Sequence, residues 1–304
     1  MSTIVANPTL EDESGCHNEL HGFLPVLEAN SSLFQPGQLR ERLIALDRLD
    51  AAFGDFDFED SASSPLLHRR VKALRAQLET ANAELYQSVR SEFVRSGQPC
   101  ALLQWLENAA GDEESKSPSP GLGFDYRDEL VSGVLQLPEP SHPKLQPSPE
   151  MVPYQPTPVR HIFHLIAAAA IAEDDVFVDL GSGLGHVPLL VSMMTGARSL
   201  GVEVQEAYVA SARKCAQSLR LSRVQFIAQD ARDADLSRGT TFYLYSPFKG
   251  SILADVLSAL RRESLRRPIK ICSLGPCTRR LSHETWLKAS ALSDTGRITV
   301  FDSL

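Results

Sequence analysis

The stretch that decides the fold is Asp179-Leu180-Gly181-Ser182-Gly183-Leu184-Gly185-His186, in which three glycines alternate with other residues. It follows the apolar run 176–180, which has the length and composition of a buried strand. It precedes residues 186–195, whose pattern predicts a helix. Glycine lets the chain turn sharply and lets a ligand approach the backbone, and the following helix presents free N–H groups. A strand, a glycine turn and a helix in this order predict a nucleotide-binding site.

The alternation of strands and helices continues to the end of the chain. Helices are predicted over 157–172, 186–195, 206–220 and 251–263, and strands over 176–180, 199–203, 224–228, 241–245, 269–274 and 297–301. This pattern predicts an α/β fold with a parallel sheet. Such a sheet binds ligands at the carboxyl ends of its strands.

Three acidic residues fall at the ends of the first three predicted strands. Asp179 lies beside the glycine turn, Glu203 ends the second strand, and Asp230 follows the third, next to Ala231. Glu203 can accept hydrogen bonds from two ribose hydroxyls, and Asp230 can accept one from an adenine amino group. S-adenosyl-L-methionine has an amino group and a sulfonium, both cationic, and no phosphate. An acid at position 179 therefore suits it.

A dinucleotide such as NAD is the main alternative ligand. Its binding turn has the pattern G-x-G-x-x-G, but His186 stands at the last glycine position of this chain. A carboxylate at Asp179 would also repel a pyrophosphate. A Walker A loop is excluded because no Gly-Lys-Ser/Thr follows the glycines. A nicotinamide oxidoreductase is therefore the less favoured hypothesis.

From these residues, roughly 154–304 resemble the class I S-adenosylmethionine-dependent methyltransferases. The most similar subgroups are the non-SET histone lysine methyltransferases of the disruptor-of-telomeric-silencing type and related small lysine methyltransferases. The resemblance implies a Rossmann-like, seven-stranded methyltransferase sheet with an N-terminal helical appendage. It also implies that one set of residues binds S-adenosyl-L-methionine, namely Tyr154, Thr157, Asp179, Gly181, Ser182, Gly183, Gly185, Glu203, Asp230 and Ala231.

The segment Tyr154-Gln155-Pro156-Thr157-Pro158 carries one part of this resemblance. In the similar enzymes a Tyr-x-Pro segment lies upstream of the glycine turn and folds over the methionine end of the cofactor. The alternative for Tyr154 is an ordinary loop anchor. His186 is a departure, because the histone enzymes usually have Gln at that position.

The second departure follows the fourth predicted strand, where the chain reads Tyr245-Ser246-Pro247-Phe248 instead of an Asn-rich segment. It is similar to the polar-Pro-aromatic motif of amine methyltransferases. Tyr245 and Phe248 could wall a dry pocket that lowers the pKa of a lysine ammonium, and the Ser246 hydroxyl or carbonyl could orient the amine. Alternatively, Pro247 ends the strand and Phe248 packs in the core.

The resulting hypothesis is a methyltransferase that needs no metal and acts on a protein lysine amine. A small-molecule acceptor and a non-catalytic methyltransferase-fold binding module are kept as alternatives. The histone enzymes' basic tail is missing from this chain, so histone specificity has little support.

The first half of the chain has a different character. Residues 1–36 show no periodicity and are expected to be disordered or loosely docked. An acidic helical region is expected over 37–137, a proline-rich linker that covers the cofactor over 138–158, and the methyltransferase domain over 159–304. An apolar seam on a helix predicted from Pro65 to Arg95 favours packing against neighbouring helices over a dimer zipper.

Composition restricts the partners and the compartment. Residues 1–150 hold 24 acidic and 12 basic residues, and residues 151–304 hold 14 and 18, which is too weakly basic to predict nucleic-acid binding. Five scattered cysteines without a metal-site spacing, no signal peptide and no membrane-length apolar run predict a cytoplasmic protein that does not enter membranes. One basic cluster is interpreted as a solvated helix end, and it comprises Arg261, Arg262, Arg266, Arg267 and Lys270. The sequence predicts no oligomeric state.

Overall fold

The computed structural model describes residues 22–54, 65–107, 123–137, 149–290 and 294–304, without the side chains of 52–54 and 107. The chain forms two compact units, Met1–Ser88 and Val89–Leu304. The division falls inside the long helix α3 (Pro65–Ser96). The helical region expected over 37–137 is thus divided between both units.

The helices of the first unit share one apolar core. Residues 22–29 are helical, and the 3₁₀ turns η1 (Ser31–Phe34) and η2 (Pro36–Gln38) lead into α2 (Leu39–Gly54) and α3. The core contains Leu24, Leu33, Ala45, Leu49, Leu67, Val71, Leu74 and Leu78. The apolar seam of α3 packs against neighbouring helices, as predicted.

The expectation of disorder over 1–36 is wrong for residues 22–36. Leu24 and Leu33 are buried in the core of the first unit, and burying two leucines favours an ordered segment. A polar contact also holds this segment, because the buried Arg42 of α2 donates to the carbonyls of Leu33 (2.8 Å) and Gln35 (2.6 Å). Residues 1–21 lie outside the described part of the chain.

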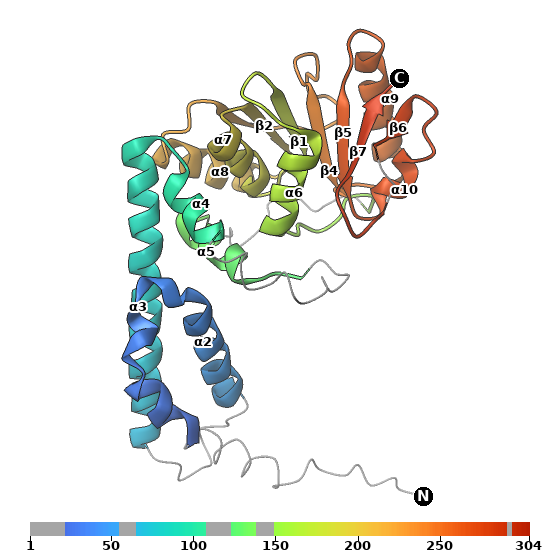
Figure 1. Cartoon of the computed structure of the whole chain (residues 1–304). Coiled ribbons are helices and arrows are strands. Elements are labelled where there is room, and N and C mark those ends of the chain that lie inside the picture. Colours follow the sequence, from blue (N-terminus) through green and yellow to red (C-terminus); the bar gives the residue numbers. More distant parts are fainter. Residues whose placement is uncertain (1–21, 55–64, 108–122, 138–148, 291–293) are drawn as a thin grey trace, which may run out of the picture. The chain divides into compact units, whose positions relative to one another are not determined.

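The second unit is built on a seven-stranded sheet with the order β3-β2-β1-β4-β5-β7-β6. Figure 1 shows β2, β1, β4 and β5 side by side. The strands are β1 (Val176–Leu180), β2 (Arg198–Glu203), β3 (Val224–Ala228), β4 (Thr241–Tyr245), β5 (Lys270–Leu274), β6 (Leu287–Ala289) and β7 (Thr299–Ser303). The expected α/β, Rossmann-like sheet is confirmed.

Two features at the β6 end of the sheet differ from the sequence pattern. The three-residue strand β6 was not predicted, because so short a run shows no clear alternation. The last strand, β7, runs antiparallel to both β5 and β6. It can do so because it follows β6 without an intervening crossover helix, which a parallel pair requires.

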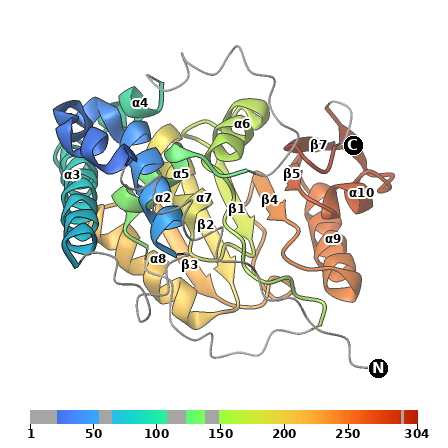
Figure 2. The same cartoon turned by 90° about the horizontal axis from the view of Figure 1, so that it is seen from below.

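Figure 2 shows the helices of this unit from below. Three of them connect successive parallel strands, namely α7 (His186–Thr195), α8 (Glu206–Ser218) and α9 (Gly250–Ser264). Three more precede β1, namely α4 (Cys100–Glu107), α5 (Tyr126–Leu135) and α6 (Val159–Ala169), and α10 (Cys277–Leu281) follows β5. In the described ranges, none of the helices combines the length and apolar character needed to cross a bilayer.

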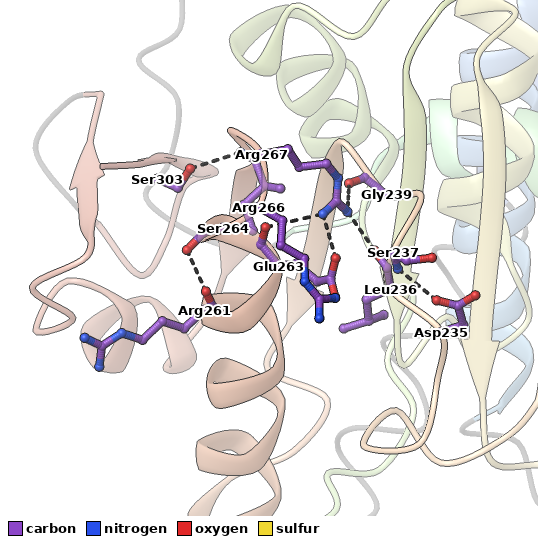
Figure 3. A network of polar contacts seen from close by, with 11 residues as sticks. Asp235, Leu236, Ser237, Gly239, Arg261, Glu263, Ser264, Arg266, Arg267 and Ser303 are labelled. Carbon is purple, nitrogen blue, oxygen red and sulfur yellow. Dashed lines mark hydrogen bonds and ion pairs between the residues drawn. The ribbon is translucent and has the colours of Figure 1, made fainter.

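The basic cluster lies at the end of α9 and just beyond it, and Figure 3 shows the contacts of Arg261, Arg266 and Arg267 with neighbouring residues. The Arg267 guanidinium pairs with Glu263 of α9 (2.7 Å) and donates to the carbonyls of Leu236 (2.8 Å) and Gly239 (2.7 Å) in the β3–β4 loop. Arg266 also pairs with Glu263 (2.9 Å). The cluster thus includes structural contacts between the end of α9 and the β3–β4 loop, beyond the solvated helix end that the sequence suggested.

We expect the Arg267→Ala variant to lower the free energy of unfolding by roughly 2 kcal/mol, because it leaves two carbonyls without their charged donor and removes one of the two ion pairs of Glu263. Urea denaturation measures this change. The matched control is Arg262→Ala, since Arg262 is exposed in the last turn of α9 and should change stability by less than about 0.5 kcal/mol. Equal losses in both variants would contradict the assigned role of Arg267.

Candidate active site

The glycine turn after β1 has the backbone that its sequence predicts. Gly181, Gly183 and Gly185 have φ values of +89°, +52° and +85°, a region that residues with a Cβ adopt at a cost. The N–H groups of Gly181 and Ser182 donate to the Val202 carbonyl of β2 (2.8 and 3.0 Å). The turn therefore lies against the end of β2, directly before α7.

The Asp179 carboxyl at the end of β1 is 3% exposed. Burial raises its pKa well above the ordinary value, and the nearby Glu203 raises it further. A buried carboxyl of this kind is costly to ionise alone, but a cation beside it favours the ionised form. Asp179 is thus suited to hold a positively charged group of a ligand.

The Glu203 carboxylate at the end of β2 is held by two backbone donors. Its Oε2 atom accepts from the Gly183 N–H and its Oε1 atom from the Gln205 N–H, both at 2.9 Å. Each oxygen retains a second acceptor position. Glu203 can therefore keep its orientation while it accepts hydrogen bonds from ligand hydroxyls.

Asp230, after β3, has a partner that the sequence analysis did not foresee. Its carboxylate accepts from the Arg232 guanidinium at 3.0 and 2.8 Å and from the Arg232 N–H at 2.9 Å. These contacts lower the pKa of Asp230, so it stays ionised at neutral pH. Ala231 beside it is buried.

Residues 151–158, here called the strap, cross the site without forming a helix. At the first end, the Val152 N–H donates to the Pro247 carbonyl (3.0 Å) and Met151 forms a β-bridge with Phe248. At the other end, the Val159 N–H donates to the Asp128 carboxylate of α5 (2.8 Å). The described part of the proline-rich segment is thus extended and held at both ends.

Two side chains of the strap point into the site. The Tyr154 ring lies so close to Gly183 that a Cβ there would overlap it, and the Tyr154 hydroxyl is 3.1 Å from His186 Nδ1. Burial lowers the pKa of His186 to about 4, so this histidine is neutral at pH 7. The Thr157 hydroxyl is 3.1 Å from the hydroxyl of Tyr243 on β4.

The residues after β4 divide between the site and the core. The Tyr245 hydroxyl is buried and has no hydrogen-bond partner among the described residues, and burial raises its pKa. The Ser246 hydroxyl donates to the Leu274 carbonyl (3.1 Å) and accepts from the Cys277 N–H (2.9 Å). Phe248 is 6% exposed and belongs to the core.

The contacts of Ser246 use only part of its hydrogen-bonding capacity. Its donor hydrogen and one of its two acceptor positions are engaged within the chain, at the end of β5 and the start of α10, and one acceptor position is left for an amine. The core packing of Phe248 matches the alternative that the sequence analysis left open. Tyr245 is the one predicted catalytic side chain whose polar atom is buried without a partner among the described residues.

These residues surround a cavity of about 940 Å³. Of the predicted site residues, eleven line it, namely Tyr154, Thr157, Asp179, Gly181, Ser182, Glu203, Asp230, Ala231, Tyr245, Ser246 and Phe248. Gly183 and Gly185 do not line it, because the first supports the Tyr154 ring and the second packs against Phe226. Within the described ranges, no group of acidic, histidine and cysteine side chains could hold a metal ion.

The sequence analysis missed several residues that line the cavity. They include Gln205, Tyr208, Tyr243, Lys249 and Arg280. Tyr208 packs against Tyr154 with ring centroids 5.3 Å apart. The available signal was that Tyr208 lies in the first turn of the helix predicted over 206–220, directly after the second strand and Gln205. No local pattern pointed to Arg280.

One known family matches part of this chain. Residues 152–243 match the model of the family described as histone methylation protein DOT1. This segment is a class I methyltransferase core related to DOT1. The match spans less than a third of the chain, and methyltransferase, the expected enzyme class, is the class of the matched family. No curated protein matches the chain.

Solved structures give weaker similarities. An RNA methyltransferase from Salinibacter ruber in complex with S-adenosyl-L-homocysteine shares 26% identity over 49% of this chain and 92% of its own, with a TM-score of 0.38. A Geobacter sulfurreducens SAM-dependent methyltransferase in complex with the same compound shares 24% over 38% and 47%, with a TM-score of 0.33. Both TM-scores are too low to carry a substrate or a residue role over to this chain.

The DOT1-related segment contains the strap, the glycine turn and the three acids, and it ends at Tyr243 of β4. Tyr245, Lys249 and Arg280 lie beyond it, although they line the same cavity. The part that the family model matches thus holds the acidic side of the cavity. The match stops before the side of the cavity over β4 and β5 that holds Lys249 and Arg280.

Proposed function

We propose that this chain transfers a methyl group from S-adenosyl-L-methionine to an acceptor that enters over β4 and β5. The observation that carries the proposal is the convergence of the acids at the ends of β1, β2 and β3 on one cavity beneath the strap. Parallel sheets of this topology bind ligands at that edge. The buried hydroxyls of Ser182 and Tyr245, which lack partners among the described residues, favour a polar ligand there.

The residues that line the cavity can be assigned to successive parts of this cofactor. Asp179 would hold its amino group, Glu203 its ribose hydroxyls, and Asp230 with Ala231 its adenine. Tyr154 and Thr157 would cover it from the strap. The neutral His186 adds no positive charge beside a sulfonium.

When bound, S-adenosyl-L-methionine supplies a methyl group that the acceptor's lone pair takes, while the electrons of the broken S–C bond remain on sulfur. This chain's contribution is to bring the acceptor into line and to exclude water. The strap covers the site, and Tyr245 provides a buried hydroxyl that can orient the acceptor.

Titration calorimetry with S-adenosyl-L-methionine and with NADH tests the cofactor. We expect binding of the first and none of the second, because a pyrophosphate offers no cationic group to the buried Asp179 carboxyl. The reverse result would indicate a nicotinamide oxidoreductase. A radiolabelled methyl donor added with cell extract then tests catalysis. Cofactor binding without label transfer in repeated extracts would favour a non-catalytic module.

A further inference from the structure

The charged residues that line the cavity are separated by sign. The three acids, Asp179, Glu203 and Asp230, lie at the ends of β1, β2 and β3. The two bases, Lys249 and Arg280, lie after β4 and after β5. In the sheet order β3-β2-β1-β4-β5, the cavity is therefore acidic along one half of the edge and basic along the other.

Among the described residues, no acidic side chain that lines the cavity forms an ion pair with either base. The Lys249 ammonium has no ion pair or hydrogen bond with another described residue. Arg280 pairs with Glu284 one helical turn away (2.9 Å), but it is exposed, and such a surface pair costs little to share with a ligand. Neither base belongs to the cofactor half of the site.

Glu150, whose backbone carbonyl accepts from the Lys249 N–H, has its carboxylate engaged by a helix. The Glu150 carboxylate accepts from the Ser251 hydroxyl (2.8 Å) and the Ile252 N–H (3.1 Å) at the start of α9. It does not line the cavity. The half over β4 and β5 therefore presents two cationic side chains and no acid, beside the apolar side chains of Met151, Phe248, Ile252 and Leu253.

We propose that the methyl acceptor is a small molecule with an anionic group, carboxylate or phosphate, which Lys249 and Arg280 bind. This inference rests on the proposed function, because it assigns the acceptor to the half that the cofactor leaves open. Guanidinium and ammonium groups are the usual partners of carboxylates and phosphates. The apolar walls nearby would hold the uncharged body of the molecule.

The charge of this half disfavours a lysine acceptor. A lysine must reach the site from its ammonium form, since its reference pKa is about 10.4. Two cationic side chains repel that form, and no acidic side chain lines this half to bind it.

The size of the cavity fits a small acceptor. Its volume of about 940 Å³ lies at the upper end of the range of roughly 300–1,000 Å³ for small-molecule sites. That volume accommodates a nucleoside-sized cofactor together with a second small molecule. The strap, held at both ends, covers the site and would obstruct a folded macromolecule.

Three probes of one shape test the inference, namely benzoate, benzamide and benzylamine. Each is titrated, with fluorescence or NMR detection, into the free full-length protein and into protein saturated with S-adenosylhomocysteine. We expect benzoate to bind and its neutral and cationic analogues to bind at least about tenfold more weakly, since only benzoate offers an anionic partner to the two bases. Inorganic phosphate as competitor distinguishes a phosphate site from a carboxylate site.

The variants Lys249→Gln and Arg280→Gln should each weaken benzoate binding about tenfold and leave S-adenosylhomocysteine affinity within about twofold, because both residues lie outside the acidic half. The matched control is Arg279→Gln, since Arg279 precedes Arg280 on α10, is exposed and does not line the cavity. It should leave both affinities unchanged.

Several outcomes would overturn the inference. They are equal binding of benzoate and benzylamine, an equal loss in the Arg279 control, or single-stranded RNA that binds more tightly than benzoate through Lys249 and Arg280. A protein that binds S-adenosylhomocysteine but not benzoate or phosphate would refute the anionic acceptor alone. A protein that binds benzoate through these bases but not S-adenosylhomocysteine would refute the proposed function instead.

Discussion

The Asp179→Asn variant should lose at least about 100-fold in affinity for S-adenosyl-L-methionine while it keeps its fold. Removing one partner of a buried charge pair typically costs about 3–5 kcal/mol, and Asp179 is 3% exposed at the end of β1. Asparagine has the same shape but no negative charge. Titration calorimetry measures the affinity, and thermal unfolding of the free protein measures the fold.

The pH dependence adds a second readout to this variant. Burial and Glu203 raise the pKa of Asp179 in the free protein, so the carboxyl retains a proton to higher pH than usual. A bound cation favours the ionised form, so binding should release a proton, and affinity should increase as pH rises through the raised pKa. Calorimetry in buffers of different ionisation enthalpy detects that proton, and Asp179→Asn should release none.

The same shift affects the stability of the free protein in a defined direction. A carboxyl whose pKa is higher folded than unfolded contributes stability below its unfolded value of about 3.9, and this contribution is lost as pH rises through the folded value. The Asn variant lacks that loss. The difference between its Tm and that of the wild type should therefore increase as pH rises from the unfolded to the folded pKa of Asp179.

A matched control uses a second acid close in the sequence. Asp174, in the turn before β1, is exposed, so Asp174→Asn should leave cofactor affinity and proton release unchanged. The assignment of Asp179 fails if its Asn variant binds the cofactor as the wild type does, or if the Asp174 control loses as much.

The second large effect is expected for Gly183→Ala. A Cβ at this position would overlap the Tyr154 ring, and its φ of +52° disfavours any residue other than glycine. Strain and overlap together should lower the free energy of unfolding by about 2–4 kcal/mol. Displacing Tyr154 should also weaken cofactor binding, which calorimetry measures beside the Tm.

Two further variants separate backbone strain from the contact with Tyr154. Gly97 also has a positive φ of +68° but nothing within 4 Å of its Cβ position, so Gly97→Ala should show the strain alone, about 1 kcal/mol. The double variant Gly183→Ala with Tyr154→Ala should be more stable than the sum of its single changes. Strict additivity would mean that the ring contact is not the cause.

The patterns of apolar and glycine residues predicted the parallel strands, the turn after β1 and the three acids that line the cavity. Such features follow from local rules, since a strand, a left-handed glycine or the end of a strand is specified by neighbours in the sequence. The methyltransferase fold was therefore accessible without coordinates. The exceptions are β6, which is too short to show alternation, and the antiparallel direction of β7.

Contacts between distant residues decided the rest. The Ser246 hydroxyl contacts Leu274 and Cys277, so its donor hydrogen is used within the chain, although the sequence shows only a serine before a proline. Lys249 and Arg280 line the same cavity because β4 and β5 are neighbours in the sheet. Which side chains share a cavity depends on how the strands pair, and no local pattern contains that pairing. The sequence by itself thus determined the acidic half of the cavity, and the tertiary structure determined the basic half.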